Sequence, residues 1–346
     1  MQQKQHKTKN STQAPPSESY DMLHNVHLPL ELILNIVHCS LPPGGPNQIV
    51  DISTPEAQLL VAWTQVSRAT YKYATQLLRE HCVYINTTSR LQRFLQCLSD
   101  SKDSEAASTL PSTTRLTSVS SVYFGLDKDE MLYPELHLFK DLCSELGHSL
   151  RRLIIDIPFR KRLPQTWLDT DCNAMFVKGL EQLPSVEEFV TTGGLPAIDF
   201  WRHTSPVCAL WPNLSRVASF ETSLTEEELW SNIATRRTLG TVVLALPSLA
   251  QQHKWNVKRA IGQHWNRDSG RDPSCARPLR ITLANHEYST PMIDTEDEEV
   301  HDPMGLISVS YLGVPVPDTM NARFDHACRE WLIDSAIKDT LWEFGA

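Results

Sequence analysis

Side chains whose types and spacing could support chemistry are few in this sequence. His24 and His27 are the only close histidine pair, and no CxxC or HExxH pattern accompanies them, so we expect no zinc site. The acidic run from Asp294 to Asp302 suggests calcium. It lacks the sixth-position glycine and terminal glutamate of an EF-hand loop, so a solvated loop is favoured. Cys208 and His203 could form a nucleophile–base pair, but no third group is placed to orient them.

Glycine patterns that cradle phosphates or shape a catalytic turn are also missing. The sequence has no GxSxG elbow, no Walker loop and no dinucleotide-binding fingerprint. We therefore expect a protein that is not an enzyme, with no catalytic residue, no cofactor and no metal ligand. An α/β enzyme whose site residues are brought together only by the fold is the least favoured alternative.

Composition points to a folded, intracellular protein. Of the 346 residues, 41% are hydrophobic and 21% are charged, which is too apolar for general disorder. No apolar run approaches the length of a membrane helix, and the polar, basic start does not resemble a secretory signal. The eight cysteines form no CxxC pair, which indicates free thiols in a reducing compartment. We expect a cytoplasmic or nuclear location, or both.

The acidic charge is confined to one part of the chain. The formal net charge is −9, yet the segment from His286 to the end alone holds 13 acidic and 3 basic residues. Such a segment would repel phosphates, so neither nucleic acid nor an anionic membrane is an expected partner. A basic protein segment is a possible ligand, and the alternative is that these carboxylates only keep that end of the protein soluble.

Local patterns predict a helical N-terminal part after a polar tail over residues 1–24. Apolar residues at helical spacing predict a helix in Leu28–His38, followed by a proline- and glycine-rich loop over Leu41–Pro55. A second helix begins at Ser53 or Thr54 with Glu56 completing a capping box. The sequence further predicts a helix over Arg68–Arg79, a strand over Cys82–Ile85, a helix over Arg90–Leu98 and a Ser/Thr-rich linker over 99–114.

Residues 115–346 alternate short apolar runs with helical or loop stretches, which predicts a mixed α/β fold. Leucine-rich-repeat solenoids use strand-plus-helix units of similar length, and we favour an irregular version of that architecture over one ordinary α/β sheet. The last helix, Arg323–Trp342, is expected to cap the open end. The predicted strands are Leu116–Phe124, Leu150–Ile157, Val186–Thr191, Leu214–Phe220, Leu239–Leu246, Leu279–Leu283 and Leu306–Leu312.

Nine tryptophans are many for this length, and most are expected in the core. Exposed aromatic side chains often anchor protein interfaces, which is the alternative for four tryptophans in weakly periodic segments. These four are Trp201, Trp211, Trp255 and Trp265.

Residues 27–85 resemble an F-box followed by its exit strand. The opening Leu28-Pro29-Leu30-Glu31-Leu32-Ile33 with Ile36 is similar to the family pattern L-P-x-E-L-x-x-x-I. A later stretch is similar to the second half of the family pattern, with Val66-Ser67-Arg68, Tyr71, Ala74, Leu77-Leu78 and His81-Cys82-Val83-Tyr84-Ile85. The match covers about a sixth of the chain, and an N-terminal F-box with a weak strand–helix array is similar to many fungal F-box proteins.

The resemblance implies the substrate-recognition subunit of an SCF-type, cullin-RING ubiquitin ligase. Residues 25–98 would form the F-box-like module that binds a Skp-type adaptor and, through it, the cullin scaffold. Residues 115–346 would form the leucine-rich-repeat-like domain that binds an unknown target protein. The alternative is a non-catalytic interaction scaffold that does not join a ligase. The adaptor-binding residues would be Leu28, Pro29, Leu32, Ile33, Ile36, Val37, Val66, Tyr71, Leu77 and Leu78.

Overall fold

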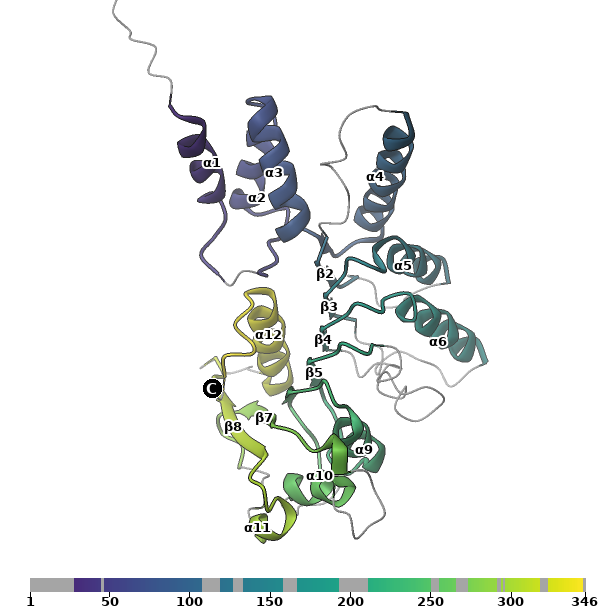
Figure 1. The fold of residues 1–346 in the computed structure, drawn as a ribbon, viewed down its shortest axis with the longest axis vertical. Coiled ribbons are helices and arrows are strands. Elements are labelled where there is room, and N and C mark those ends of the chain that lie inside the picture. The colour runs from purple at the N-terminus through teal and green to yellow at the C-terminus, as the bar shows by residue number, and fades with distance from the viewer. Residues whose placement is uncertain are drawn as a thin grey trace, which may run out of the picture.

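The protein has a mixed α/β fold built on eight parallel strands that pair in chain order, β1 next to β2 and so on to β8 (Figure 1). The strands are β1 (Tyr84–Ile85), β2 (Ser121–Phe124), β3 (Arg152–Ile155), β4 (Glu188–Thr191), β5 (Arg216–Phe220), β6 (Thr241–Ala245), β7 (Leu279–His286) and β8 (Ile307–Val314). The computed structural model describes residues 28–44, 47–107, 119–126, 133–157, 167–192, 211–249, 255–265, 273–290, 294, 296–317 and 323–344.

All eight strands fall within or beside the apolar runs that predicted them. Both faces of the sheet are covered, so the inner strands consist almost entirely of buried residues and read as continuous apolar runs. In-register pairing aligns equivalent residues into apolar rows. The row on one face is Val122, Leu153, Phe189, Val217, Val242 and Ile281. The row on the other face is Tyr123, Ile154, Val190, Ala218 and Val243.

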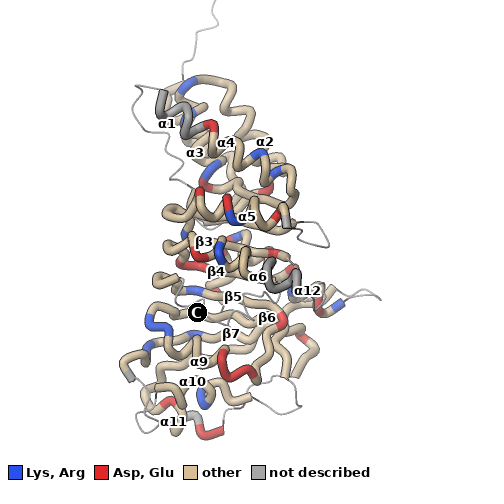
Figure 2. The backbone as a smooth tube through the Cα atoms, turned by 90° about the vertical axis from the view of Figure 1, so that its right-hand side faces the viewer, with Lys and Arg blue, Asp and Glu red and all other residues tan. Residues whose placement is uncertain are grey.

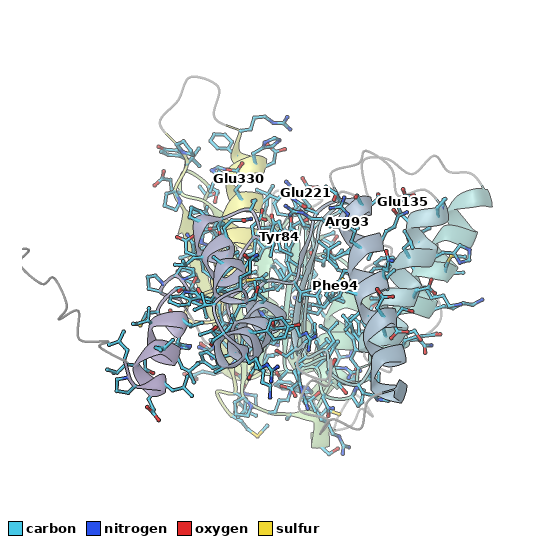
Figure 3. The ribbon with its side chains drawn as sticks, turned by 90° about the horizontal axis from the view of Figure 1, so that it is seen from above. Tyr84, Arg93, Phe94, Glu135, Glu221 and Glu330 are labelled. Carbon is cyan, nitrogen blue, oxygen red and sulfur yellow. The ribbon has the colours of Figure 1, made fainter. Side chains whose placement is uncertain are left out.

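Helices that connect successive strands cover the first of these faces (Figures 1 and 3). They are α4 (Thr88–Ala107), α5 (Tyr133–Leu146), α6 (Trp167–Leu180), α9 (Glu227–Thr235) and α10 (Val257–Trp265), and the short α11 (Glu298–His301) packs on α10. Figure 3 views the sheet edge-on, with Phe94 on this side and Tyr84 on the opposite side.

The opposite face is covered by α12 (Phe324–Ile337), which corrects the prediction that the last helix caps the open end. Cys328, Leu332 and Ala336 are fully buried against the second apolar row. A helix placed at the end of the array would leave that row in water, and burying apolar surface stabilises by about 25 cal/mol per Å². The helix therefore folds back over the middle of the sheet.

The predicted linker over 99–114 is also wrong in its first half, because α4 continues to Ala107. Residues 108–114 lie outside the described residues, as does the predicted tail over 1–24. In addition, Val83, Ile85, Leu91 and Leu98 belong to the main core of the sheet rather than to the N-terminal helices. The boundary between the two packing units therefore lies just after Cys82 and not at 99–114.

The N-terminal helices α1 (Leu30–His38), α2 (Pro55–Trp63) and α3 (Arg68–His81) have a small core of their own. The side chain of Thr54 caps α2 by accepting the Ala57 N–H, instead of the predicted box between Ser53 and Glu56. A capping box is present one helix later, where Ser67 and Thr70 satisfy each other's backbone N–H groups at the start of α3. The small core consists of Val37, Val50, Ala57, Leu60, Ala74, Leu77 and Cys82.

Two of the four tryptophans in weakly periodic segments are core residues. Trp211 is fully buried and Trp265 is 7% exposed, while Trp255 is half-buried and Trp201 lies outside the described residues. The core alternative is therefore the correct one for Trp211 and Trp265. In the described part of the chain, no helix has the length and apolar character to cross a membrane.

Gly262 marks the closest approach between α10 and α11. A Cβ atom at this position would lie 2.0 Å from the carbonyl oxygen of His301. We expect Gly262→Ala to lower the free energy of unfolding by about 1–3 kcal/mol through overpacking, although alanine normally favours a helix. Gly240→Ala is the control, since no atom lies within 4 Å of its Cβ position. Chemical denaturation of both variants tests this, and equal stability of the two would contradict the close contact.

Candidate protein-docking surface

The N-terminal helices expose an unusual number of large apolar side chains. Each of them is 47–63% exposed, and they come from all three helices and the turns beside them. Exposed apolar groups gathered on one small unit mark an interaction site more often than scattered ones do. We name this set the N-terminal apolar surface, and it consists of Leu28, Leu30, Leu32, Ile36, Leu59, Val66 and Tyr71.

The helical unit is too small to bury these groups itself. In α1, Val37 points into the small core and is fully buried, while Leu32 and Ile36, four residues apart, remain about half exposed. A unit of this size buries only a modest fraction of its surface, so part of the apolar stripe stays outside. No described residue from the rest of the chain covers it, and Figure 1 shows α1 at the outer side of the molecule.

Six of the ten residues predicted to bind the adaptor are exposed, and two of the others require a correction. Leu28, Pro29, Leu32, Ile36, Val66 and Tyr71 are exposed, and Ile33 and Leu78 are half-buried. Val37 and Leu77 are buried at 0% and 3% exposure inside the small core, so neither is available to a partner. Both were assigned to the surface because they share the apolar stripe of their helix, and only packing decides which part of a stripe faces inward.

Leu30 and Leu59 belong to the surface, although the sequence interpretation did not place them there. Leu30 lies inside the stretch that was singled out, but it was not assigned a contact. In α2, Ala57 and Leu60 form the buried face, and Leu59 therefore points outward. The three-residue spacing of Ala57 and Leu60 was the available signal, since residues three apart share a helix face.

Polar contacts hold α1 against its neighbours. The Trp63 Nε1 group donates to Ser40 Oγ at 3.1 Å, and Ser40 Oγ in turn donates to the Ile36 carbonyl at 3.2 Å. The Tyr73 hydroxyl lies 3.4 Å from His38 Nδ1. These contacts fix the end of α1 relative to α2 and α3, so the N-terminal apolar surface has a defined shape.

The proline- and glycine-rich loop after α1 docks the helical unit onto the sheet. The Ile49 N–H donates to the Ile337 carbonyl at 2.9 Å, and the Val50 N–H donates to the His81 carbonyl at 2.6 Å. One bond reaches the end of α12 and the other the end of α3. The long loop therefore connects the helical unit to the sheet domain. It does not cover the outer face of α1.

A buried arginine at the amino end of β3 strengthens this junction. Arg152 Nε lies 3.3 Å from Glu188, and Arg152 Nη2 lies 3.4 Å from Asp339. Its guanidinium also donates to the Asn47 carbonyl at 2.5 Å and to the Ala336 carbonyl. Burial lowers the pKa of Arg152, while Asp339 and Glu188 act in the opposite direction. One side chain therefore connects the loop, the sheet and the end of α12.

A second polar cluster lies at the carboxyl ends of the strands. Asp156, directly after β3, accepts from the Tyr123 hydroxyl at 2.8 Å, from Thr192 Oγ1 at 2.5 Å and from Arg329 of α12. Tyr84 stacks on Tyr123 with ring centroids 4.2 Å apart. Burial and the Asp156 charge raise the pKa of Tyr123, so it stays a hydrogen-bond donor at neutral pH. All three donors bind the same carboxylate, and one of them belongs to α12. The cluster therefore holds α12 on the sheet and does not have the arrangement of an acid–base pair.

Of the residues considered for chemistry, the structure describes part of the acidic run from Asp294 to Asp302. Asp302, at the end of the acidic run, accepts the backbone N–H groups of Leu306 and Ile307 at 2.9 and 2.8 Å. Among the described residues, no group of three or more His, Cys, Asp or Glu side chains could hold a metal ion. His24, His27, His203 and Cys208 lie outside the described residues.

The small core should make stability sensitive to alkaline pH. Burial, reinforced by Asp51, raises the pKa of the Cys82 thiol from 9.0 to about 12. Above pH 9 the unfolded chain loses this proton while the folded chain keeps it, so stability falls as pH rises, by about 1.4 kcal/mol per pH unit. Denaturation of the wild type and Cys82→Ala between pH 8 and pH 10 tests this. Parallel pH profiles for the two proteins would contradict it, because other groups titrate equally in both.

Comparisons with known proteins identify no family. No protein-family model matches the sequence, and no curated protein matches it. A search of solved structures finds a mutant O-GlcNAc hydrolase from Thermobaculum terrenum at 10% sequence identity and a TM-score of 0.23. The alignment covers 73% of this chain and 59% of that protein, and similarity at this level carries no argument about fold or activity.

Proposed function

We propose that the protein is a substrate receptor of an SCF-type ubiquitin ligase, in which α1–α3 bind a Skp-type adaptor and the strand–helix array binds a target protein. The observation that carries this proposal is the N-terminal apolar surface. It coincides with the F-box-like residues Leu28, Leu32 and Ile36, and it is left uncovered by the described chain. A partner with a matching apolar face would bury it, as adaptors do for F-box helices.

The strand–helix array fits a leucine-rich-repeat-like solenoid. Support comes from eight parallel strands in strict chain order and from connecting helices that share one face of the sheet. In such arrays each unit packs mainly on its neighbours. The returning helix α12 departs from a simple solenoid, because it covers the face that arrays of this kind usually leave open.

In this role the protein performs no bond chemistry of its own. It would raise the effective concentration of target lysines near a conjugating enzyme, and this works best when the adaptor site and the target site are rigidly connected. The contacts of Arg152 and of the loop at Ile49 provide that connection, since they join the α1–α3 unit to both the sheet and α12.

Co-purification with a Skp-type adaptor tests the proposal. We expect the wild type to retain the adaptor and the double variant Leu32→Glu/Ile36→Glu to lose it, because two charges would enter an apolar contact. The control is Val300→Glu/Met304→Glu, which changes two apolar residues far from α1 that are 71% and 64% exposed, against 49% and 47% for Leu32 and Ile36, and it should retain the adaptor.

Circular dichroism and thermal melting of both double variants keep the test interpretable, since all four residues are exposed and the fold should survive. Undiminished adaptor binding by the Leu32/Ile36 variant would overturn the assigned surface. Absence of adaptor binding by the wild type would favour the alternative, an interaction scaffold that does not join a ligase.

A further inference from the structure

The end of the molecule opposite α1 carries the remaining large exposed apolar side chains of the described chain. Tyr288, Val300, Met304 and Phe324 are 45–71% exposed and lie beside the last two strands. Outside the N-terminal apolar surface and this group, the described residues include no other large apolar side chain that is exposed to this degree. The protein therefore has two ends suited to partners, and only the first is used by the proposed adaptor contact.

The last strand, β8, forms one edge of the sheet. Among the described strands it pairs with β7 alone, and its eight residues, Ile307-Ser-Val-Ser-Tyr-Leu-Gly-Val314, include no charge and no proline. Proteins usually protect long edge strands with lysine, proline or a bulge, because a bare edge pairs with other chains. The opposite edge strand, β1, has only two residues and presents little to pair with.

The direction of each backbone group along β8 follows from its bonds to β7. The Leu279 N–H donates to the Leu306 carbonyl at 2.9 Å, and the Glu287 N–H donates to the Val314 carbonyl at 3.0 Å. In a parallel pair, every second residue of a strand directs both its N–H and its C=O toward the same neighbour. The even-numbered residues of β8 therefore face β7, and the odd-numbered residues face away from it.

The odd-numbered residues leave a row of backbone groups open at the edge. The Ile307 N–H points away from β7 and is taken by Asp302 Oδ2 at 2.8 Å, as the alternation requires. For Val309, Tyr311 and Gly313, no backbone hydrogen bond to another loop or turn of the described chain occurs. These three residues offer the donor and acceptor pattern that an added strand needs.

Charge indicates which kind of strand would bind. The segment from His286 onward holds 13 acidic and 3 basic residues. Glu296, Asp297 and Glu299 are exposed and precede β8 in the chain, and Figure 2 shows acidic segments in red beside α11. Pairing two copies of the chain through β8 would bring two such acidic ends together, which is unfavourable. An extended segment with lysine or arginine would instead gain from the field at this end.

We propose that the open edge of β8 binds an extended basic segment of the target protein, which adds to the sheet as a further strand. Backbone bonds to Val309, Tyr311 and Gly313 would hold the segment, and its basic side chains would lie near the acidic stretch before β8. That the segment belongs to a ligase target rests on the proposed function. The binding itself does not depend on the adaptor.

Fluorescence anisotropy with two labelled peptides tests the edge directly. Both share a strand-forming core of alternating Thr and Val, flanked by lysines in one peptide and by glutamates in the other. We expect the lysine peptide to bind at least about tenfold more tightly at low salt, with a difference that shrinks as salt screens the charges. Equal binding of the two peptides would overturn the charge preference.

Val309→Pro removes an outward N–H while keeping the bonds to β7, since proline is tolerated at an edge position whose N–H faces solvent. We expect it to weaken the lysine peptide at least about tenfold, because the added strand loses a backbone partner and meets the proline ring. The matched control Val309→Thr keeps the N–H and the β-branched shape and should bind as the wild type does. Unchanged binding by Val309→Pro would overturn the edge assignment.

The acidic contribution is tested by Glu296→Gln/Glu299→Gln, with Glu227→Gln/Glu228→Gln on α9 as the control of equal charge change. Only Glu296→Gln/Glu299→Gln should weaken binding of the lysine peptide. Equal weakening by both double variants would contradict a contribution from the acidic residues before β8. Light scattering measures the oligomeric state of the wild type and of Val309→Pro. A dimeric wild type and a monomeric variant would show that β8 pairs with a second copy of the chain, which would overturn the proposal. Val309→Pro should still bind the adaptor, so loss of peptide binding by this variant tests the β8 edge and not the proposed adaptor contact.

Discussion

Arg152→Ala is expected to lower the free energy of unfolding by about 3–5 kcal/mol, because it leaves the buried Asp339 carboxylate without its counter-charge. The Arg152 side chain is 2% exposed, and the two carboxylates that it contacts, Glu188 and Asp339, are 12% and 6% exposed. The Asn47 and Ala336 carbonyls lose a charged donor at the same time. Glu188 keeps its contacts with Arg216 and Trp342. Among the described residues, Asp339 keeps only the neutral N–H groups of Asn47, so Asp339 is the carboxylate that loses its counter-charge.

The neighbouring residue provides a matched control. Arg151 pairs with Glu187 at the surface, where both side chains are about half exposed, so Arg151→Ala should cost no more than about 1 kcal/mol. Urea denaturation of the two variants measures the difference. Limited proteolysis should also cut the Leu41–Pro55 loop faster in Arg152→Ala, because this loop is docked through the Asn47 carbonyl. Similar stability of the two variants would refute the role of Arg152 as the junction.

Trp211→Ala is expected to cost about 3–5 kcal/mol, the range typical of removing a large aromatic side chain from a core. Trp211 is fully buried and packs on Phe189 with ring centroids 4.8 Å apart. Its Nε1 group donates to the carbonyl of Leu180, the last residue of α6, at 3.2 Å. The Leu180 carbonyl also accepts the Leu183 N–H at 3.1 Å, so the indole adds a second hydrogen bond at the end of α6 and links that helix to the segment before β5.

The same arrangement recurs two units later, which makes the interpretation testable twice. Trp265 Nε1 donates to the Ala234 carbonyl near the end of α9 at 2.9 Å, and again the two residues are 31 positions apart. Trp211→Phe should recover part of the loss by restoring packing without the N–H. Tyr288→Ala, at an aromatic residue that is 69% exposed, should change stability by less than about 0.5 kcal/mol. A small effect of Trp211→Ala, comparable to that of Tyr288→Ala, would show that neighbouring units are not joined in this way.

Both predictions concern residues that connect packing units of the protein rather than residues of a binding surface. They affect function because these connections make the protein rigid. Arg152 fixes the N-terminal helices to the sheet, and Trp211 fixes one strand–helix unit to the next. If the N-terminal apolar surface binds an adaptor and the β8 edge binds a target, these joints set the distance and orientation between the two partners. Variants weakened at a joint should therefore retain each binding activity separately under conditions where they remain folded.

The sequence by itself located the strands and the helices α1–α4 and α12, whereas α5, α6, α9, α10 and α11 were expected only as helical or loop stretches between strands. The run Leu239–Leu246 is largely apolar on both alternating faces, and a strand buried on both sides can be recognised from that property alone. It also placed the exposed part of the candidate surface at Leu28, Leu32 and Ile36, because an F-box-like opening and an apolar helix stripe are local patterns. Local spacing shows which residues of a helix or strand form an apolar face. It does not show which other element packs on that face.

Only the tertiary structure decided what covers each apolar face. Residues Val37 and Ile36 are adjacent and both apolar, yet one is fully buried and the other about half exposed, because α2 and α3 pack on one side of α1 only. In the same way, the last helix carries apolar residues suited either to the end of the sheet or to its second face. It occupies the second face because Asp156 and Arg152 supply polar contacts there and because packing on the row around Ile154 removes apolar surface of both from water. Contacts between residues more than 150 positions apart carry no signal in local spacing, and these contacts fix the final arrangement.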